Sequence, residues 1–590
     1  MGGPPGVSST STTPTPFKHA RSTDNTHDLQ SQAAPLPSNL PFRLVSKTIG
    51  CGAYASIRKA APKTASTPII AVKFIHKEHA FRTGRLRPKQ LLIEISLHQM
   101  VSGHDNVIRY LSHSTDDPQW VWMAMELAEG GDLFDKIEAD VGVGENVAHF
   151  YFTQLVAAIS WCHGKGVAHR DVKPENVLVS GSGDLKVADF GLATRFRDDE
   201  GGKRKWCAMV CGSPPYIAPE ILAAGRENAG VVRKRKAGTE GGGEGDVEEG
   251  GKAKAKAGYD PEAADVWSVA IVLFVLLAGN TPWDSPVMGE SYEFHDFVSS
   301  GGKPGDELWE KIPPEAMGLV LGMLSVDVGG RMGMQDVKRH PWFTRRNPHL
   351  NAKGKAANPV GLATQLLEGL RIDFNSTELP ASSQQQPPSQ NAMDIDTPQP
   401  SQQPPPPPPN LDWEPSQSQA PTSAGFQSTQ QARDFLLSLA SDPAMSQFMA
   451  TPSVPLTLTQ QARQFKDILP SASLAKFFSP LPLPQLLVQL QDAFARLDIN
   501  LAIPTTPAGN EAAESQLHIH DQGTFSLYLS ALDTRQQPLQ GHLVFSRFID
   551  ASEELIEVRF LKAKGDPVGW RRLFKRVAVL CREGIVRPPE

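Results

Sequence analysis

The chain has 590 residues, which is too long for one hydrophobic core, so we expect at least two domains. Its formal net charge is −6, and this near balance gives no general reason to expect nucleic acid as a partner. The five cysteines are an odd, scattered set that suits a reducing compartment and offers no disulfide framework.

The N-terminal stretch, residues 1–42, is rich in Ser, Thr and Pro, and we expect it to be a disordered extension. It lacks the basic start and apolar run of a secretory signal. Gly6 stands where a myristoylation motif has Ser or Thr. The longest apolar run, Val266–Gly279, is short for a bilayer span and indicates a buried core helix. We therefore expect a soluble, intracellular protein without a transmembrane segment.

A globular segment is predicted over residues 43–343. Short β-prone runs bounded by Gly and Pro predict strands over Leu44–Ile49, Ala55–Lys59, Ile69–Ile75 and Trp120–Glu126. Leu91–Met100 has the apolar spacing of a helix, and the patterns after Glu145 are mostly helical. The implied architecture is α+β, with a small strand-rich lobe before a larger helical lobe.

Two stretches are poor in the large apolar residues that a core needs. Residues 227–258 are rich in Gly, Lys, Glu and Ala, and we expect a disordered insertion there. Its basic run Arg233–Lys236 is either a nuclear-import signal or a solvated loop, and both alternatives stay open. Residues 344–468 contain a Gln-, Ser- and Pro-rich stretch with six consecutive prolines at 404–409, which predicts a linker.

A second compact unit, a small α+β domain, is predicted over residues 469–590. Apolar residues share one helical face between Leu486 and Leu497, and they alternate with polar ones at Leu543–Phe545 and Ile556–Phe560, which indicates strands. Trp570–Cys581 has the spacing of an amphipathic helix, with basic residues mostly on the opposite face. That basic face would dock on the helical lobe of the first segment, bind anionic lipid or simply face solvent.

The chemistry is concentrated in His169–Asn176, which reads HRDVKPEN, and in Asp189–Gly191, which reads DFG. Asp171 has the position to accept the proton of an attacking hydroxyl, and Lys173 to neutralise the γ-phosphate as it leaves. Asn176 and Asp189 supply the oxygen ligands that would hold Mg²⁺ against the phosphates of ATP. These residues predict phosphoryl transfer with ATP and Mg²⁺ as cofactors.

A glycine-containing loop lies between two predicted strands, where Gly50 and Gly52 would let the backbone approach phosphates. The third glycine of the usual pattern is replaced by Ala55. Downstream, Lys73 would pair with the α- and β-phosphates, and Glu94 on the following helix is the acid expected to hold it. The alternative is that Lys73 and Glu94 are ordinary surface charges.

The segment Met125–Ala128 should form a hinge whose backbone binds the adenine edge. Asp132 would reach the ribose or a basic substrate residue, or would cap a helix. The full set of residues expected to bind the nucleotide is Ile49, Gly50, Gly52, Ile57, Ala71, Lys73, Met125, Glu126, Ala128, Asp132, Glu175, Asn176, Leu178 and Asp189.

Three further residues are expected to organise the helical lobe. Glu220 would form a buried ion pair with Arg331. Asp265 would hold the catalytic loop, His169–Asn176, in place. The stretch Arg195–Gly212 contains no Ser, Thr or Tyr, so no phosphate can form there to dock on Arg170. We hypothesise that an acid of the run Asp198–Glu200 partly substitutes for it.

These residues resemble the eukaryotic protein kinase family over about 300 residues. Lys173 after Asp171 is similar to the serine/threonine class. Four segments look like those of the DNA-damage checkpoint kinase 1 family, namely Gly130–Glu138, His169–Asn176, Asp189–Thr194 and Cys211–Tyr216. The tail Lys564–Phe574 is similar to that family's C-terminal kinase-associated domain. The insertion at 227–258, Ala55 and Ser213, where the family usually has Thr, depart from the pattern.

The resemblance implies a bilobal kinase fold and transfer of phosphate to Ser or Thr in protein substrates. It also implies a preference for a basic residue three positions before the target, read by acids that match Asp132 and Glu175. The family works without activation-loop phosphorylation. It acts in the cell-cycle checkpoint, and we expect this chain in the nucleus and also in the cytoplasm.

The family further implies that the C-terminal domain restrains the kinase domain by an intramolecular contact. Upstream damage-sensing kinases relieve the restraint by phosphorylating Ser-Gln sites in the linker. The linker has such dipeptides at Ser383, Ser389, Ser401, Ser416, Ser418, Thr429 and Ser446. A Gln-rich composition also produces some of them by chance.

Two other readings stay open. Energy- or polarity-sensing kinases also carry a kinase-associated domain, although the missing activation-loop hydroxyls argue against that class. A pseudokinase scaffold is the other alternative, against which stands the complete set Lys73, Glu94, Asp171, Asn176 and Asp189.

Overall fold

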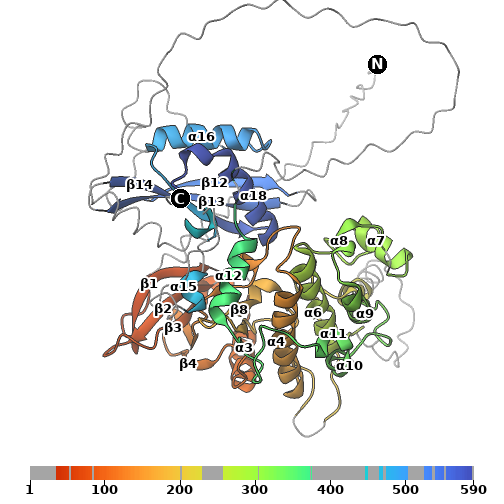
Figure 1. Ribbon diagram of the computed structural model, residues 1–590. Helices are drawn as coiled ribbons and strands as arrows, with labels where there is room; N and C mark the ends of the chain where they lie inside the picture. Colours follow the sequence, from red (N-terminus) through yellow and green to blue (C-terminus); the bar gives the residue numbers. More distant parts are fainter. Residues whose placement is uncertain are drawn as a thin grey trace, which may run out of the picture. The chain divides into compact units, whose positions relative to one another are not determined.

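The structure, a computed structural model, describes residues 35–51, 55–82, 86–198, 202–228, 257–302, 304–372, 374, 445–448, 464–469, 474–501, 524–533, 538–550 and 553–587 (Figure 1). Its contacts divide the chain into two units, which are described separately. The first unit comprises residues 1–102 and 108–127, and the second comprises residues 103–107 and 128–590.

The first unit is built on an antiparallel five-stranded sheet in the order β1-β2-β3-β5-β4. Its elements are β1 (Phe42–Cys51), β2 (Ala55–Pro62), β3 (Ile70–His76), α2 (Lys77–Arg82), α3 (Pro88–Val101), β4 (Tyr110–Ser114) and β5 (Trp120–Glu126). The four predicted strands and the helix at 91–100 are confirmed. Strand β4 was not predicted, because its central residues are exposed and show no apolar alternation.

Alternation along β3 and β5 decides which side chains face α3. Phe74 and Trp122 point into a cluster on one face of the sheet, whereas Ile75 and Met123 point to the other. The second cluster also contains residues of α3, so this helix covers that face. Because successive strand residues alternate, Lys73 shares the face of Ile75 and lies on the side of the helix.

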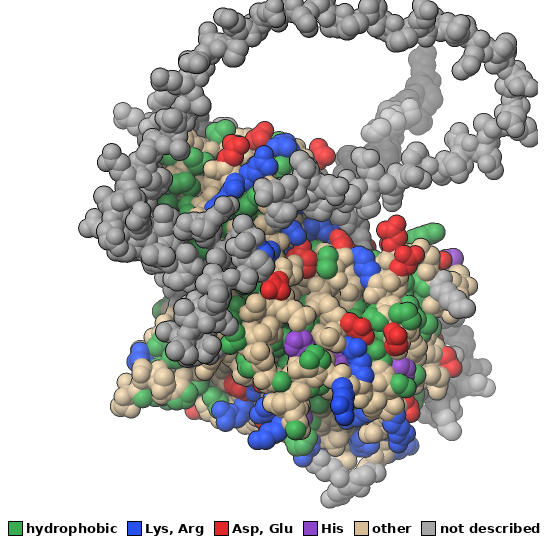
Figure 2. All heavy atoms as spheres, in the orientation of Figure 1, with side chains coloured by type: hydrophobic (Ala, Val, Ile, Leu, Met, Phe, Trp, Pro, Cys, Tyr) green, Lys and Arg blue, Asp and Glu red, His purple; other side chains and the backbone are tan. Residues whose placement is uncertain are grey.

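The second unit begins with a mostly helical part. Its elements are β6 (Gly131–Asp132), η1 (Phe134–Lys136), α4 (Glu145–Gly164), β7 (Val167–Ala168), η2 (Pro174–Asn176), β8 (Val177–Val179), β9 (Leu185–Val187), β10 (Thr194–Arg195), α6 (Pro261–Ala278), α7 (Tyr292–Ser299), α8 (Glu307–Glu310), α9 (Pro314–Met323), α10 (Met334–Arg339), α11 (Pro341–Thr344) and α12 (Pro359–Gly369). Strands β6, β8 and β9 form one small sheet, and β7 pairs with β10. In Figure 2 both signs of charge are interspersed over the visible face of these helices, as the near-neutral composition would suggest.

Helix α6 is the core of this part, and the expectation of a buried helix at 266–279 is confirmed. Asp260 caps its N-terminus by accepting the Glu262 N–H, and Gly279 ends it in the left-handed conformation at φ 73°. Among the described residues, α6 is the helix long and apolar enough to span a membrane, and 89% of it is buried inside the protein. Its neighbour α4 packs along it (Figure 1).

The predicted ion pair between Glu220 and Arg331 is present. The guanidinium donates two hydrogen bonds to the carboxylate, at 2.7 and 3.0 Å, and its side chain is 1% exposed. It also donates to the carbonyls of Ser325 and Ala263 and lies over the Trp267 ring. The Arg331 side chain therefore connects Glu220, at the end of the activation segment that follows Asp189, to α6 and to the loop before α10.

The C-terminal part of the second unit contains a four-stranded antiparallel sheet in the order β11-β14-β13-β12. The elements are η3 (Met445–Phe448), α15 (Phe465–Ile468), β11 (Lys476–Ser479), α16 (Leu483–Ala495), β12 (Thr524–Leu532), β13 (Pro538–Asp550), β14 (Glu553–Lys564), α18 (Pro567–Leu580) and η4 (Arg582–Gly584). The predicted helices and the strands at 543–545 and 556–560 are confirmed. The hydrophobic core also takes in Ile372, Phe374, Met445 and Phe448, from two short segments inside the stretch predicted as a linker.

One basic residue of α18 departs from the predicted pattern. Arg571 is only 6% exposed, and its guanidinium donates to the carbonyl of Leu370 and to Oε1 of Gln447. It also donates to the Leu474 carbonyl. Arg571 is thus a buried connector between three chain segments rather than part of a solvated face. Helical periodicity could not show this, because its partners come from distant parts of the sequence.

Replacing Arg331 with alanine should lower the free energy of unfolding by about 3 kcal/mol, because Glu220 would keep its charge without a partner. Urea unfolding of the full chain, followed through its first transition, measures this. The control is Arg339→Ala, whose side chain is 79% exposed and pairs with Asp336 within one helix turn. The control should change stability by less than about 0.5 kcal/mol, and equal losses in the two variants would contradict the assignment.

Candidate active site

In the first unit, the Lys73 ammonium contacts the Glu94 carboxylate at 2.7 Å, as predicted. Glu94 is 4% exposed and comes from α3, which covers the face of the sheet where Lys73 points. An ion pair this deeply buried is no ordinary surface charge. The contact holds the Lys73 ammonium next to α3, and an acid on a helix holds the phosphate-binding lysine of protein kinases in the same way.

In the second unit, the Asp171 carboxylate is surrounded by three donors. Its Oδ1 accepts a hydrogen bond from the Ser213 hydroxyl at 3.1 Å. Its Oδ2 accepts from Nδ2 of Asn176 at 3.0 Å and contacts the Lys173 ammonium at 3.0 Å. These three donors fix the carboxylate in one orientation, as a group that takes a proton from a hydroxyl needs to be held.

Lys173 has a second contact that ties it to the activation segment. Its ammonium donates to the Ser213 hydroxyl at 2.7 Å. Burial works against its charge, but the neighbouring carboxylates of Asp171 and Glu175 raise the pKa of Lys173, so the side chain stays protonated. In the sequence, Ser213 stands out only as a departure from the family pattern. The structure makes it the bridge between Lys173 and Asp171.

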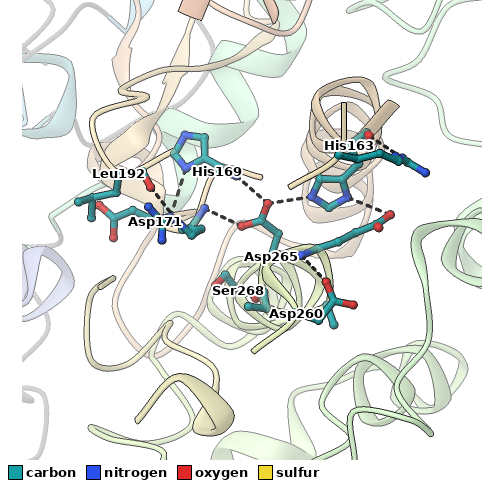
Figure 3. A network of polar contacts seen from close by, with 12 residues as sticks. His163, His169, Asp171, Leu192, Asp260, Asp265 and Ser268 are labelled. Atoms are coloured by element: carbon teal, nitrogen blue, oxygen red, sulfur yellow. Dashed lines mark hydrogen bonds and ion pairs between the residues drawn. The ribbon is translucent and has the colours of Figure 1, made fainter. Parts of the chain in front are cut away.

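The Asp265 carboxylate holds the catalytic loop from inside the helical part (Figure 3). Oδ1 accepts the backbone N–H of Arg170 at 2.7 Å, while Oδ2 accepts the backbone N–H of His169 and Nε2–H of His163, both at 2.8 Å. Burial opposes ionisation, yet the His163 hydrogen bond and the backbone donors hold the pKa of Asp265 below its usual range. The predicted ordering role of Asp265 is thereby given a geometry.

His169 links the catalytic loop to the strand that precedes Asp189. Its Nδ1 accepts the backbone N–H of Asp171 at 3.3 Å, so the proton sits on Nε2, which donates to the Ala188 carbonyl at 3.1 Å. The side chain is fully buried. The two segments that carry the predicted catalytic and metal-binding residues are therefore bonded to each other.

Asn176 and Asp189 lie at the open end of the β8–β9 hairpin. Val177 is the partner of Val187, and the Ala188 N–H donates to the Asn176 carbonyl at 2.8 Å. Asp189 follows Ala188 directly, so Asn176 and Asp189 are neighbours across the hairpin. The amide nitrogen of Asn176 donates to Asp171, which leaves its oxygen as the coordinating atom. An amide oxygen and a carboxylate are the hard oxygen donors that Mg²⁺ takes, so the set fits this ion.

Arg170 and Asp189 both have left-handed backbone conformations, with φ of 65° and 61°. Neither is glycine, and such conformations persist only where surrounding contacts enforce them. The Asp265 bonds to the Arg170 backbone and the turn from Asp189 Oδ1 to the Gly191 N–H supply those contacts.

The other predicted nucleotide-binding residues divide between the two units. Ile49, Gly50, Ile57, Ala71, Met125 and Glu126 lie in the first, on β1, β2, β3 and β5, with Ala71 directly opposite Met125. Ala128, Asp132, Glu175 and Leu178 lie in the second, with Asp132 opposite Leu178 in the β6–β8 pair. Gly52, at the tip of the predicted glycine loop, lies outside the described residues.

Two acids near the catalytic loop have perturbed protonation. Burial, with help from the Asp135 carboxylate, raises the pKa of Asp132 to about 7, and burial also raises the pKa of Glu175. Oδ1 of Asp132 also accepts the Asp135 N–H at 3.0 Å. The N-cap position of η1 is Leu133, one residue later, so Asp132 bonds the first turn of η1 without being its N-cap residue.

We expected an acid of the run Asp198–Glu200 to take the place of an activation-loop phosphate at Arg170. For Asp198, the one of these acids that the structure describes, this expectation was wrong. Asp198 pairs with Lys205 at 2.9 Å and with Arg195 rather than with Arg170. Asp199 and Glu200 lie outside the described residues. The Arg170 guanidinium instead donates to the Leu192 carbonyl at 2.7 Å and to the Tyr259 hydroxyl at 3.3 Å. No local pattern pointed to Tyr259, because it lies 89 positions further along the chain.

Asp265→Asn should lower the free energy of unfolding by about 2–4 kcal/mol at pH 7, because charge-assisted hydrogen bonds to buried donors would be lost. The pKa of Asp265 is lowered in the folded chain, so its contribution is present at neutral pH and lost as the pH falls through that lowered value. Denaturation curves from pH 7 to pH 3 check this, and the gap between wild type and variant should shrink in acid. A gap that is constant with pH would contradict the assignment.

Comparison with known proteins identifies the family to which this chain belongs. The model of the protein kinase domain matches residues 44–232 and 255–343. The serine/threonine-protein kinase chk1 of Schizosaccharomyces pombe is 33% identical over 550 residues, which cover 93% of this chain and 97% of that protein. The serine/threonine-protein kinase CHK1 of Saccharomyces cerevisiae is 32% identical over 569 residues, covering 95% and 99%.

A plant kinase gives a shorter match. The CBL-interacting protein kinase 20 of Oryza sativa subsp. japonica is 32% identical over 366 residues, which cover 60% of this chain and 65% of that protein. The Schizosaccharomyces pombe and Saccharomyces cerevisiae kinases therefore match this chain nearly end to end. Both the catalytic residues and the full-length likeness thus agree, and the chain belongs to the CHK1 family of serine/threonine protein kinases.

Proposed function

We propose that this CHK1-type kinase transfers the γ-phosphate of Mg-ATP to Ser and Thr in proteins with a basic residue three positions before the target. The proposal places it in the DNA-damage or replication checkpoint, under restraint by its C-terminal domain. The observation that carries the catalytic part is the Asp171 carboxylate, held by Ser213, Lys173 and Asn176 within 3.1 Å.

Each residue has a role that follows from its chemistry. Asp171 accepts the proton of the attacking hydroxyl, and Lys173 stabilises the charge of the phosphoryl group in transfer. Asn176 and Asp189 would hold Mg²⁺, which spreads the negative charge of the phosphates when it is bound. Lys73, kept in place by Glu94, would bind the α- and β-phosphates.

The preference for a basic residue is supported by the state of Asp132 and Glu175. A raised carboxyl pKa means that the negative charge lacks full compensation in the free protein. An arginine from a substrate would supply it, and a bidentate guanidinium–carboxylate contact is among the stronger hydrogen-bonded pairs. A neutral substrate residue would offer these carboxyl groups no cation, so it would not gain this contact.

Asp171→Asn should reduce phosphate incorporation at least about a thousandfold, because the amide cannot take up the proton and disturbs the Lys173 contact. Radioactive Mg-ATP with a Ser peptide, with and without Arg at the third position before the Ser, measures both claims. Wild type should prefer the Arg peptide by about tenfold or more. Asp327→Asn, in an exposed turn, is the control. Equal incorporation by wild type and Asp171→Asn would refute the enzymatic proposal.

Restraint by the C-terminal domain is supported by charges on α18 and β14. Arg572 pairs with Asp140 at 2.5 Å, and Lys575 pairs with Glu138. Glu138 and Asp140 follow η1, shortly after Asp132. Lys562 lies close enough to Glu175 to lower its pKa, although burial keeps the net shift upward. Basic groups thus lie beside the acids that would read a substrate arginine.

Relief of the restraint by Ser-Gln-directed kinases is also part of the proposal. The dipeptides from Ser383 to Thr429 lie outside the described residues. The last one falls in η3, where Gln447 is fully buried and bonded to Lys476 and Arg571. A kinase that recognises this glutamine could reach it only after η3 leaves the core, so phosphorylation there and release of the C-terminal domain would be coupled.

The double change Arg572→Glu with Lys575→Glu should raise turnover of the full chain about threefold to tenfold, because both contacts with Glu138 and Asp140 become repulsive. Initial rates on an Arg-containing peptide at saturating Mg-ATP check this. The control is Arg496→Glu on an exposed position at the end of α16. Unchanged turnover in a folded double variant would remove the support for restraint and favour a plain solvated face.

The alternatives are weaker. A pseudokinase scaffold would not need the paired Lys73 and Glu94 or the bonded Asp171 cluster. The plant kinase match covers 60% of the chain, whereas the Schizosaccharomyces pombe and Saccharomyces cerevisiae CHK1 matches cover 93% and 95%. Nuclear location stays a prediction, since Arg233–Lys236 lies outside the described residues.

A further inference from the structure

Arg170 immediately precedes the catalytic Asp171, and the residue is only 7% exposed. In kinases that are switched on by phosphorylation, an arginine at this position receives the phosphate of the activation segment. The sequence has no hydroxyl side chain from Arg195 through Gly212, so a phosphate from that stretch is not available here. A buried guanidinium nevertheless needs acceptors, because unsatisfied charged donors are costly.

The acceptors come from a carbonyl and a phenol. Arg170 Nε donates to the Leu192 carbonyl at 2.7 Å, and Nη1 donates to the Tyr259 hydroxyl at 3.3 Å. Tyr259 is 2% exposed. Its own hydroxyl proton goes to the Met209 carbonyl at 2.8 Å. The Tyr259 hydroxyl thus accepts a hydrogen bond from Arg170 of the catalytic loop and donates one to Met209 of the activation segment.

The backbone of Tyr259 strengthens this link. Its N–H donates to the Cys207 carbonyl at 2.7 Å, and its carbonyl accepts the Cys207 N–H at 2.9 Å. Together with the hydroxyl bond, these backbone bonds connect both Cys207 and Met209 to Tyr259. Four positions after Met209, the same segment carries Ser213, which contacts both Asp171 and Lys173. The segment is therefore bonded at one end to Tyr259 and at the other to the catalytic pair.

The Asp265 carboxylate binds the backbone N–H of Arg170, and the titratable side chains of the segment that contains Cys207 and Cys211 supply no negative charge to the Arg170 guanidinium. Burial raises the pKa of both Cys207 and Cys211, so these thiols stay neutral. Asp198 is engaged with Lys205 and Arg195. Burial likewise raises the pKa of Tyr259, which keeps the phenol protonated and able to donate to Met209.

We propose that Tyr259 is a positioning residue that replaces the activation-segment phosphate. Its neutral hydroxyl joins Arg170 to Met209 and so holds Ser213 against Asp171 and Lys173 without any phosphorylation. This inference rests on the proposed kinase activity. Tyr259 acts through Arg170 and the segment, and it touches neither nucleotide nor substrate.

The test is Tyr259→Phe, which removes one oxygen and leaves the backbone pairing with Cys207 in place. The kcat should fall about threefold to tenfold, as expected for one hydrogen bond to a charged group, while the KM for ATP stays the same. The matched control is Tyr292→Phe, whose side chain is 82% exposed. Wild-type turnover is measured first, so that its absence would count against the proposed function rather than against Tyr259.

A double-mutant cycle separates positioning from general stability. In an Arg170→Gln background, Tyr259→Phe should have no further effect on kcat, because the partner of the hydroxyl is gone. Amide hydrogen exchange provides a readout that needs no activity, and Tyr259→Phe should speed exchange at residues 205–211 but not in α4. An unchanged kcat, an equal fold loss in both backgrounds, or unchanged exchange at 205–211 would each overturn the proposal.

Discussion

The structure depends on one buried carboxylate. Asp265 lies on a helix that is almost wholly inside the protein, and it binds the two consecutive backbone N–H groups of His169 and Arg170. These bonds hold Arg170 in a left-handed conformation that a non-glycine residue does not adopt freely. The turn that follows brings Asp171 to Ser213, Lys173 and Asn176. Burying the Asp265 charge is costly, and it is offset here because the two backbone N–H groups and His163 donate hydrogen bonds to it.

The second organising feature is a surplus of partly buried acids after the hinge. Asp132 and Glu175 have raised pKa values, and Glu138 and Asp140 are paired with basic residues of α18. Acids that attract an arginine from a substrate would equally attract basic residues of the same chain. The proposed substrate preference and the proposed restraint by the C-terminal domain would thus share one electrostatic cause, and moving α18 away from these acids would free them for a substrate arginine.

Local pattern predicted most of the fold and the site. Alternating apolar residues located the strands of the first unit, and motif spacing located Asp171, Asn176, Asp189 and the Lys73–Glu94 pair. What failed depends on contacts between distant residues. Arg571 reads as solvent-facing by periodicity but is buried by partners at 370, 447 and 474, and Arg170 meets Tyr259 rather than Asp198. Such pairings follow from tertiary packing, which local spacing does not encode.

The central claim is that Asp171 is the proton acceptor beside a magnesium-bound nucleotide held by Asn176 and Asp189. The most direct measurement is a crystal structure of the full chain with Mg²⁺, a non-hydrolysable ATP analogue and a Ser peptide. The account predicts an Asp171 oxygen within about 3 Å of the serine hydroxyl, with Asn176 and Asp189 as ligands of the metal. A serine bound elsewhere, or a metal held without either residue, would contradict it.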